Sequence, residues 1–264
     1  MLAEFKFGNL EGCSEAYERD GAFIVRDVLD LEFLEELNRH IDWLIERNPD
    51  LATETLGHWM VAQDPFWVRF VSDHRLLDVA ESLVGPNIAF FAADYIAKKP
   101  RTGQALLWHQ DANYWPLEPM EVVTIWFAVS ESNRENGCVK VIPGSHRLGL
   151  LEHFAETRIV NVLSSEVDLS GIDESKAEYV ELNPGDISVH HPHTIHGSEA
   201  NISDRWRRGG SIQYLPTTTH VTKPWPCTFL FRGEAVRGVD NDYKPKPKYV
   251  AGEHMSFKGC EAWR

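Results

Sequence analysis

The chain has 264 residues, of which 43% are hydrophobic and 25% charged, as in an ordinary folded domain. Its formal net charge of −14 argues against binding to nucleic acid or to an anionic membrane surface, because both are negatively charged. The four cysteines are scattered and form no CxxC pair, which predicts reduced thiols rather than disulfides or a zinc knuckle. Neither a signal peptide nor an apolar run long enough to cross a bilayer is evident, so a cytoplasmic location is expected.

The first third of the chain predicts helices around one short strand. Residues 22–25 are strand-like, and Asp30 is expected to cap a helix that runs to about Arg47 with apolar residues at three- and four-residue spacings. A second helix is predicted from 75 to 83, with Gly85 just beyond its end. Neither helix contains a group of residues typical of a catalytic or metal site, so both are expected to have a structural role.

From residue 87 onward, short β-rich runs alternate with turn signals. Strands are predicted at 88–96, 106–111, 122–129, 138–142, 178–182, 187–191, 194–198 and 207–215. Strands at this spacing, without clear helices between them, predict an antiparallel jelly roll or a closed double-sheet fold. The acidic segment 147–177 is too long for a plain connection and predicts either an active-site lid or partial disorder.

His109 and Asp111 form a His-x-Asp pair at the end of predicted strand 106–111. Because side chains alternate along a strand, the pair points the same way and can share one metal ion. Two histidines and one carboxylate on one face of an octahedron are typical of non-haem Fe(II) oxygenases. Four histidines compete for the third position, and the residues alone leave the choice open: His190, His191, His193 and His196.

Arg207 follows the histidine cluster on the next predicted strand. Alternation places Gly209, Ser211 and Gln213 on its face, and the small residues leave room there for a ligand. A guanidinium can bind a carboxylate through two charge-assisted hydrogen bonds, although an exposed strand arginine is the commoner outcome. Further cations that could recognise an anionic substrate, but that are more often solvated, are Lys98, Lys99 and Arg147.

Several short motifs, in this order, resemble the phytanoyl-CoA dioxygenase family. They are Trp108-His109-Gln110-Asp111, Glu135-Asn136-Gly137, Ile142-Pro143-Gly144-Ser145-His146 and His196-Gly197-Ser198, followed by Asn201 and Arg207. The resemblance extends from about Asp20-Gly21 to Tyr214. It implies a mainly β protein: a double-stranded β-helix (jelly roll, cupin-like) with flanking N-terminal α-helices. One domain is expected over 1–264, with a helical part at about 14–85, a β-helix core at about 87–215 and an extension at 216–264.

The resemblance also implies the roles of individual residues. His109, Asp111 and His196 would be the catalytic iron ligands, and Arg207 would pair with the far carboxylate of 2-oxoglutarate. Further contacts to this co-substrate are implied for Trp126, Ser198 and Gln213. The other histidines of the cluster would then be structural.

The implied function is an Fe(II)- and 2-oxoglutarate-dependent dioxygenase that uses O2 to hydroxylate a small-molecule metabolite and releases succinate and CO2. Asp111 disfavours halogenation, which normally requires a halide in place of the carboxylate ligand, whereas desaturation and ring formation stay open. The alternatives are a cupin-like metal-dependent hydrolase or isomerase and a non-catalytic jelly-roll binding protein. Neither the prime substrate nor the oligomeric state can be predicted from the sequence.

Overall fold

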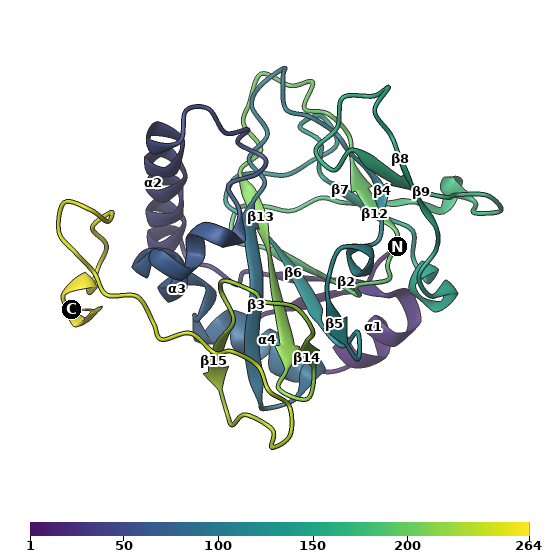
Figure 1. Ribbon diagram of the computed structural model, residues 1–264. Helices are drawn as coiled ribbons and strands as arrows, with labels where there is room; N and C mark the ends of the chain where they lie inside the picture. Colours follow the sequence, from purple (N-terminus) through teal and green to yellow (C-terminus); the bar gives the residue numbers. More distant parts are fainter. Residues whose placement is uncertain (264) are drawn as a thin grey trace.

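Two β-sheets lie against each other in the computed structural model, which describes residues 1–263 apart from the side chain of His58 (Figure 1). The larger sheet has the strand order β1 (Glu4–Lys6), β2 (Ala22–Arg26), β11 (Ile187–His190), β6 (Val123–Ala128), β13 (Gly209–Pro216), β3 (Ile88–Tyr95) and β15 (Phe229–Arg232). The smaller sheet has the order β10 (Glu178–Val180), β7 (Val139–Val141), β12 (His196–Ser198) and β4 (Leu106–His109). Two further strand pairs are β5 (Leu117–Glu118) with β14 (His220–Val221), and β8 (His153–Ala155) with β9 (Ser165–Val167).

The pairing is antiparallel except between β1 and β2. Strands distant in sequence become neighbours, since β6 lies between β11 and β13, and β12 lies between β7 and β4. This mainly β architecture confirms the predicted double-stranded β-helix with flanking helices.

The two faces of the larger sheet have different side chains because the strands alternate. On β6, Val123, Ile125 and Phe127 belong to the main hydrophobic core, whereas Thr124 and Trp126 face the smaller sheet. The outer, fully apolar face is covered by helices, and the inner face is partly polar. Polar side chains are therefore available between the sheets.

The helices are α1 (Cys13–Asp20), α2 (Leu31–Arg47), α3 (Pro65–Val71) and α4 (His74–Val84), with 3₁₀ turns η1 (His58–Gln63), η2 (Asp111–Asn113), η3 (Ser145–Leu148), η4 (Glu174–Lys176) and η5 (Cys260–Trp263). Asp30 caps α2 by accepting a hydrogen bond from Phe33 N, and Gly85, with φ 80°, ends α4. Both predicted helices are thus confirmed. In Figure 1 the C-terminal segment lies beside α2, where Lys258 pairs with Glu32.

A buried polar chain joins the helices to the larger sheet. His40 of α2 contacts Asp64, the N-cap of α3, at 2.9 Å through Nε2, and Tyr95 Oη of β3 at 3.0 Å through Nδ1. All three side chains are buried, so each depends on the others for hydrogen bonding.

Two sequence-based expectations need correction. β4 ends at His109, so Asp111 lies in η2 rather than on the strand, and β13 begins only after Arg207. Gln110 still has an extended backbone (φ −122°, ψ 127°), which keeps the expected alternation between His109 and Asp111. The segment 147–177 contains the β8–β9 hairpin.

Residues 1–263 contain no helix that is both long and apolar enough to cross a membrane.

Candidate metal centre

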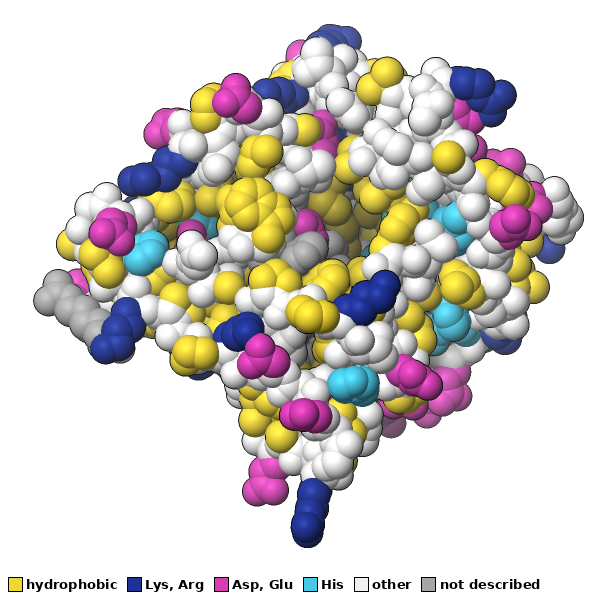
Figure 2. All heavy atoms as spheres, viewed as in Figure 1, with side chains coloured by type: hydrophobic (Ala, Val, Ile, Leu, Met, Phe, Trp, Pro, Cys, Tyr) yellow, Lys and Arg dark blue, Asp and Glu magenta, His cyan; other side chains and the backbone are white. Residues whose placement is uncertain are grey.

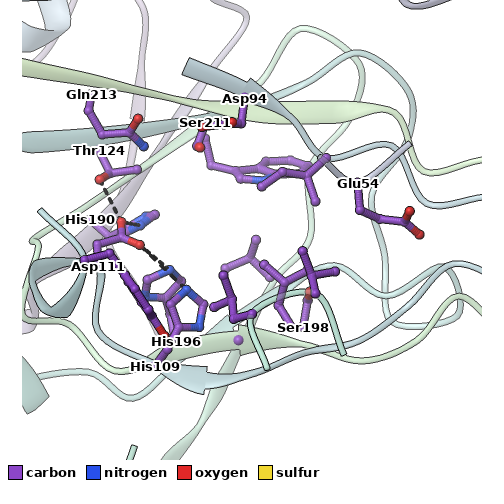
Figure 3. Close-up of a pocket in the computed structure, with 18 of the residues that line it drawn as sticks. Glu54, Asp94, His109, Asp111, Thr124, His190, His196, Ser198, Ser211 and Gln213 are labelled. Carbon is purple, nitrogen blue, oxygen red and sulfur yellow. Dashed lines mark hydrogen bonds and ion pairs between the residues drawn. The ribbon is translucent and has the colours of Figure 1, made fainter. Parts of the chain in front are cut away.

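His109, Asp111 and His196 converge between the two sheets (Figure 3). The histidines are cross-strand partners at the ends of β4 and β12, and Asp111 opens η2. Their candidate ligand atoms lie within 4.8 Å of one another, and Asp111 Oδ1 is 3.6 Å from Nε2 of each histidine. Two imidazoles and one carboxylate thus face a common point, as expected for a facial metal triad.

Both histidine rings are oriented by backbone carbonyls. His109 Nδ1 donates to Leu107 O at 2.7 Å, and His196 Nδ1 donates to Thr194 O at 2.9 Å. The proton is therefore on Nδ1, and the Nε2 lone pair faces Asp111. Burial, together with the nearby His109 and His190 rings, holds the pKa of His196 well below its ordinary value. The ring is neutral at pH 7, which is the form that binds metal.

The second oxygen of Asp111 has its own partners. Thr124 Oγ1 donates to Asp111 Oδ2 at 3.0 Å, and His190 Nε2 lies 3.4 Å from the same oxygen. Thr124 and His190 are directly opposed on β6 and β11. Burial would raise the pKa of Asp111, but the imidazoles of His196, His109 and His190 hold it well below its usual range. The carboxylate is ionised, with Oδ1 left to face the two histidines.

The four clustered histidines have different surroundings. His190 lies beside His196, with ring centroids 4.4 Å apart, but faces the far oxygen of Asp111. His191 contacts the rings of His146 and His193 instead, outside the cavity. Of the four, His196 is the one that the fold brings together with His109 and Asp111.

Gln110 faces away from the triad and links loops. Its amide donates to the carbonyls of Gly149 and His193, both at 2.7 Å, and its own carbonyl accepts from Leu151 N at 2.8 Å.

A cavity of about 290 Å³ adjoins the triad. Its walls come from both sheets and from the β8–β9 hairpin: Glu54, Ala92, Asp94, Ile96, Leu106, Tyr114, Trp115, Thr124, Trp126, Val139, Val162, Leu163, His190, Ser198, Arg207, Ser211 and Gln213. Figure 2 shows this face of the molecule hollowed near its centre, with hydrophobic side chains around the hollow. The sequence-predicted residues Trp126, Ser198, Arg207 and Gln213 all border the cavity.

Arg207 is 1% exposed at one end of this cavity. It donates to Gly137 O at 2.6 Å and to Ile96 O at 2.9 Å, and its guanidinium lies 5.2 Å from the Trp126 ring centroid. Its Nε is buried without a partner, and among the described residues no carboxylate forms an ion pair with it. Burial lowers the pKa of Arg207 to about 10, so the group remains a cation at neutral pH. Arg207 is therefore not a solvent-exposed strand arginine, which was the alternative that the sequence left open.

Lys98 is a second buried basic residue, which the sequence alone did not distinguish from its exposed neighbour Lys99. Its Nζ donates to Ser198 Oγ at 2.7 Å and to the carbonyl of Glu199. Burial, then the proximity of Arg207, lowers the pKa of Lys98 well below the ordinary value, whereas the Glu54 carboxylate raises the pKa of both Lys98 and Arg207. Arg207 therefore provides the positive charge at this end of the cavity, and Lys98 provides a hydrogen-bond donor beside it.

Comparisons with known proteins agree with this geometry. The sequence model of the family Phytanoyl-CoA dioxygenase (PhyH) matches residues 17–209. A phytanoyl-CoA dioxygenase domain-containing protein 1 homolog of Caenorhabditis briggsae is 26% identical over 172 residues, covering 63% of this chain and 60% of that protein. The chain thus spans about 60% of the length of several curated relatives.

Solved structures give the same result for the fold. The non-heme monooxygenase ThoJ is 25% identical, with a TM-score of 0.75 and coverage of 89% of this chain and 88% of that one. EctD from S. alaskensis, solved with 2-oxoglutarate and 5-hydroxyectoine, has a TM-score of 0.68 at 20% identity, covering 87% of this chain and 85% of that one. At 20% identity, the similarity to EctD shows a shared fold and nothing more.

Proposed function

Because the chain belongs to the phytanoyl-CoA dioxygenase family, we propose that it is an Fe(II)- and 2-oxoglutarate-dependent dioxygenase that hydroxylates a small-molecule metabolite. One observation carries the proposal: the buried guanidinium of Arg207, with an unpartnered Nε, borders the same cavity as the His109, Asp111 and His196 triad. A buried charge without a counter-ion is costly, and a bound carboxylate would relieve that cost. A metal-dependent hydrolase, which activates water, needs no such cation.

The donor set fits iron. Two neutral imidazoles and one carboxylate oxygen suit Fe(II) and leave adjacent positions for other ligands. We assign His109 Nε2, His196 Nε2 and Asp111 Oδ1 as the metal-binding atoms. When bound, iron and 2-oxoglutarate supply the oxidising chemistry, in which O2 is consumed, succinate and CO2 are released, and one oxygen atom is transferred to the substrate.

The residues around Arg207 suit the far carboxylate of 2-oxoglutarate. Because Ser198 Oγ accepts from Lys98, its own proton is available to donate into the cavity. Trp126 forms a flat wall beside the guanidinium. A bound carboxylate would supply the counter-ion that the buried Arg207 guanidinium lacks. These contacts fix the direction of the co-substrate, with its other end at the triad.

The same residues restrict the reaction type. Asp111 provides a carboxylate where halogenation would need a halide, so oxygen insertion is favoured, and desaturation or ring formation uses the same ligands. Val162 and Leu163 of the β8–β9 hairpin, together with Tyr114, border the cavity and limit the access of water. The prime substrate is expected to be a small molecule.

The first test is co-substrate binding by the Mn(II)-loaded protein, followed by succinate release from the Fe(II) protein. Arg207→Ala should weaken 2-oxoglutarate binding by roughly ten- to a hundredfold, because a charge-assisted hydrogen bond contributes about 1.5–3 kcal/mol. Asp111→Ala should abolish succinate release. The matched control is Arg205→Ala, since the Arg205 side chain is 53% exposed. Failure of the wild type to bind 2-oxoglutarate would favour the hydrolase or binding-protein alternatives.

Metal content tests the ligand assignment separately. His196→Ala should lose bound metal, whereas His193→Ala should retain it. Loss of metal only in the His193 variant would contradict the assignment of His196.

A further inference from the structure

The inner face of the larger sheet forms two aligned rows of side chains along the cavity. Cross-strand register places Trp126, Ser211 and Asp94 in one row, across β6, β13 and β3. The adjacent row contains Thr124, Gln213 and Ala92 on the same strands. All six border the cavity. In Figure 3 Asp94 and Ser211 lie side by side, and Gln213 lies next to Thr124.

The β6 end of each row already has a role in the proposed function. Trp126 lies beside Arg207, and Thr124 holds Asp111. The β13 and β3 residues Ser211 and Asp94 have none. Gln213, for which the resemblance implied a co-substrate contact, lies in the Thr124 row and not in the Trp126 row beside Arg207. Ala92, the small residue opposite Gln213, leaves open space on that side. These residues therefore lie one or two strands away from Trp126 and Thr124 along the cavity wall.

The Gln213 side chain indicates a position at which a ligand could bind. This side chain is 3% exposed and borders the cavity, yet within residues 1–263 its amide has no hydrogen-bond partner. Buried amides are normally hydrogen-bonded, so the amide is suited to a bound molecule. The Ser211 hydroxyl, two residues away on the same face, likewise has no partner among the described residues.

This region has an acidic side chain. Arg207 is the only lysine or arginine among the described lining residues, and it lies at the co-substrate end. Asp94 is the one carboxylate that the described part of β13 and β3 places on the cavity wall, and its Oδ1 lies so close to Gly57 that a Cβ there would be 2.6 Å away. Asp94 also interacts with another group of the protein, so it would contribute its negative charge to a ligand rather than a vacant hydrogen-bonding position. Tyr114 and Trp115 add aromatic surface, which favours cations.

We propose that Asp94, Ser211 and Gln213 form the prime-substrate wall and that the substrate is a compact organic cation, an amine with a short apolar or aromatic body. This rests on the proposed function, since it assumes that 2-oxoglutarate occupies the Arg207 end. An anionic acyl thioester is disfavoured, because the cavity of about 290 Å³ is at the small end for ligand pockets and Asp94 opposes negative charge.

The test uses three probes of similar shape and different charge: 2-phenylethylamine, 2-phenylethanol and 3-phenylpropionate. Their binding is measured by calorimetry on protein loaded with Ni(II) and saturating 2-oxoglutarate. The amine should bind at least tenfold more tightly than the alcohol, and the carboxylate should not bind. Asp94→Asn should remove most of the amine preference, whereas Gln213→Leu should weaken amine and alcohol alike. The control Glu253→Gln removes one exposed acid far along the chain and should change nothing.

Several results would overturn the substrate proposal. They are binding of the carboxylate as tight as that of the amine, an unchanged preference in Asp94→Asn, or binding of none of the probes. Retained Ni(II) binding in both cavity variants shows that they are folded, because neither residue belongs to the triad. If the wild type does not bind 2-oxoglutarate at all, the proposed function fails instead, so the two failures are distinguishable.

Discussion

At the scale of single residues, the two oxygens of Asp111 have separate tasks. Oδ2 accepts from Thr124 and lies near His190, whereas Oδ1 faces His109 and His196. Partners of this kind orient a metal ligand and typically alter metal affinity by ten- to a hundredfold. The Thr124 hydroxyl should therefore matter for metal binding although it does not contact the metal position.

Thr124→Val keeps the shape of the side chain but removes the donor to Asp111 Oδ2. We expect Mn(II) affinity to fall by about tenfold or more, since the carboxylate loses its fixed rotation. Thr124→Ser, which retains the hydroxyl, should restore affinity. The measurement is a Mn(II) titration of each variant, with thermal unfolding as the control for folding. Equal affinities in the two variants would show that the hydroxyl has no positioning role.

The sequence reveals those site residues that stand in a recognisable spacing, but not those whose role depends on contacts with distant residues. His109, Asp111 and Arg207 stand in recognisable spacings, so their types and order were informative. Lys98 was not distinguishable from Lys99, because the difference depends on burial against Ser198, a hundred positions away. Thr124 was missed for the same reason: only the β6–β11 register places it beside His190 and Asp111.

At the scale of elements, the sequence predicts the longer helices and strands, which have a strong hydrophobic pattern, better than the short ones. The helix after Asp30 and strand β6 were predicted closely, because the helix has a regular apolar stripe and the strand is a continuous buried run. The helix α1 has eight residues of which only Cys13 and Ala16 are buried, so its apolar signal is weak. The β8–β9 hairpin has exposed apolar positions such as Phe154, and its strands have only three residues each. The structure of such short elements depends on the parts of the fold against which they pack, which the local sequence does not show.

A histidine group joins the turn after α1 to the connection between β11 and β12. His191 N donates to Gly21 O, and His191 Nδ1 accepts from His193 N at 3.1 Å. Burial, then the neighbouring His146 and His193 rings, lowers the pKa of His191 to about 3. The pKa values of His146 and His193 are also lowered, mainly by burial. The folded protein therefore keeps the His191 ring neutral in mild acid and disfavours the charged forms of the other two rings.

Acid should destabilise the protein through this group. Since the His191 pKa is about 3 in the fold and about 6.5 when unfolded, the unfolded chain binds more protons between these values. The contribution of His191 to the free energy of unfolding is complete above pH 6.5. It is lost as the pH falls, by roughly 1 kcal/mol per pH unit. Urea unfolding of the metal-free protein at pH 7 and pH 5 measures this. His191→Asn, which keeps an acceptor for His193 N, should have the shallower pH dependence; equal dependences would refute the assignment.

The contact between α2, α3 and β3 depends on His40. His40→Leu would leave the Asp64 carboxylate and the Tyr95 hydroxyl buried with a lost partner. We expect a loss of about 3 kcal/mol in the free energy of unfolding, because leaving a buried carboxylate without its hydrogen-bond partner is strongly destabilising. Tyr95→Phe, which removes only the hydroxyl, should cost about 1–2 kcal/mol. Chemical denaturation measures both, and a smaller loss for His40→Leu than for Tyr95→Phe would contradict the prediction.

At the scale of the whole molecule, the site exists because strands distant in sequence are neighbours. His109 and His196 are cross-strand partners although 87 positions separate them, and β13 brings Ser211 and Gln213 beside β3 and β6. Alternation of side chains predicts which residues share a face, but not which strands pair. The family resemblance indicated the third ligand in advance, whereas the residue pattern alone left four candidates, namely His190, His191, His193 and His196.

The whole fold should also respond to its ligands. A ligand that binds only the folded state stabilises it by about 2.7 kcal/mol at a hundred times its Kd, which corresponds to roughly 5–10 °C for a chain of this size. Mn(II) should therefore raise the Tm of the wild type, and 2-oxoglutarate should raise it further.

Arg207→Met separates stability from co-substrate binding. The guanidinium is buried without a counter-ion, so an apolar replacement of similar length should leave the ligand-free protein within about 1 kcal/mol of the wild type. The Mn(II) increment in Tm should persist, because Arg207 is not among the triad residues. The 2-oxoglutarate increment should disappear, whereas Asp111→Ala should abolish both increments. Thermal unfolding with each ligand alone and together measures this, and a full 2-oxoglutarate increment in Arg207→Met would show that the co-substrate is anchored elsewhere.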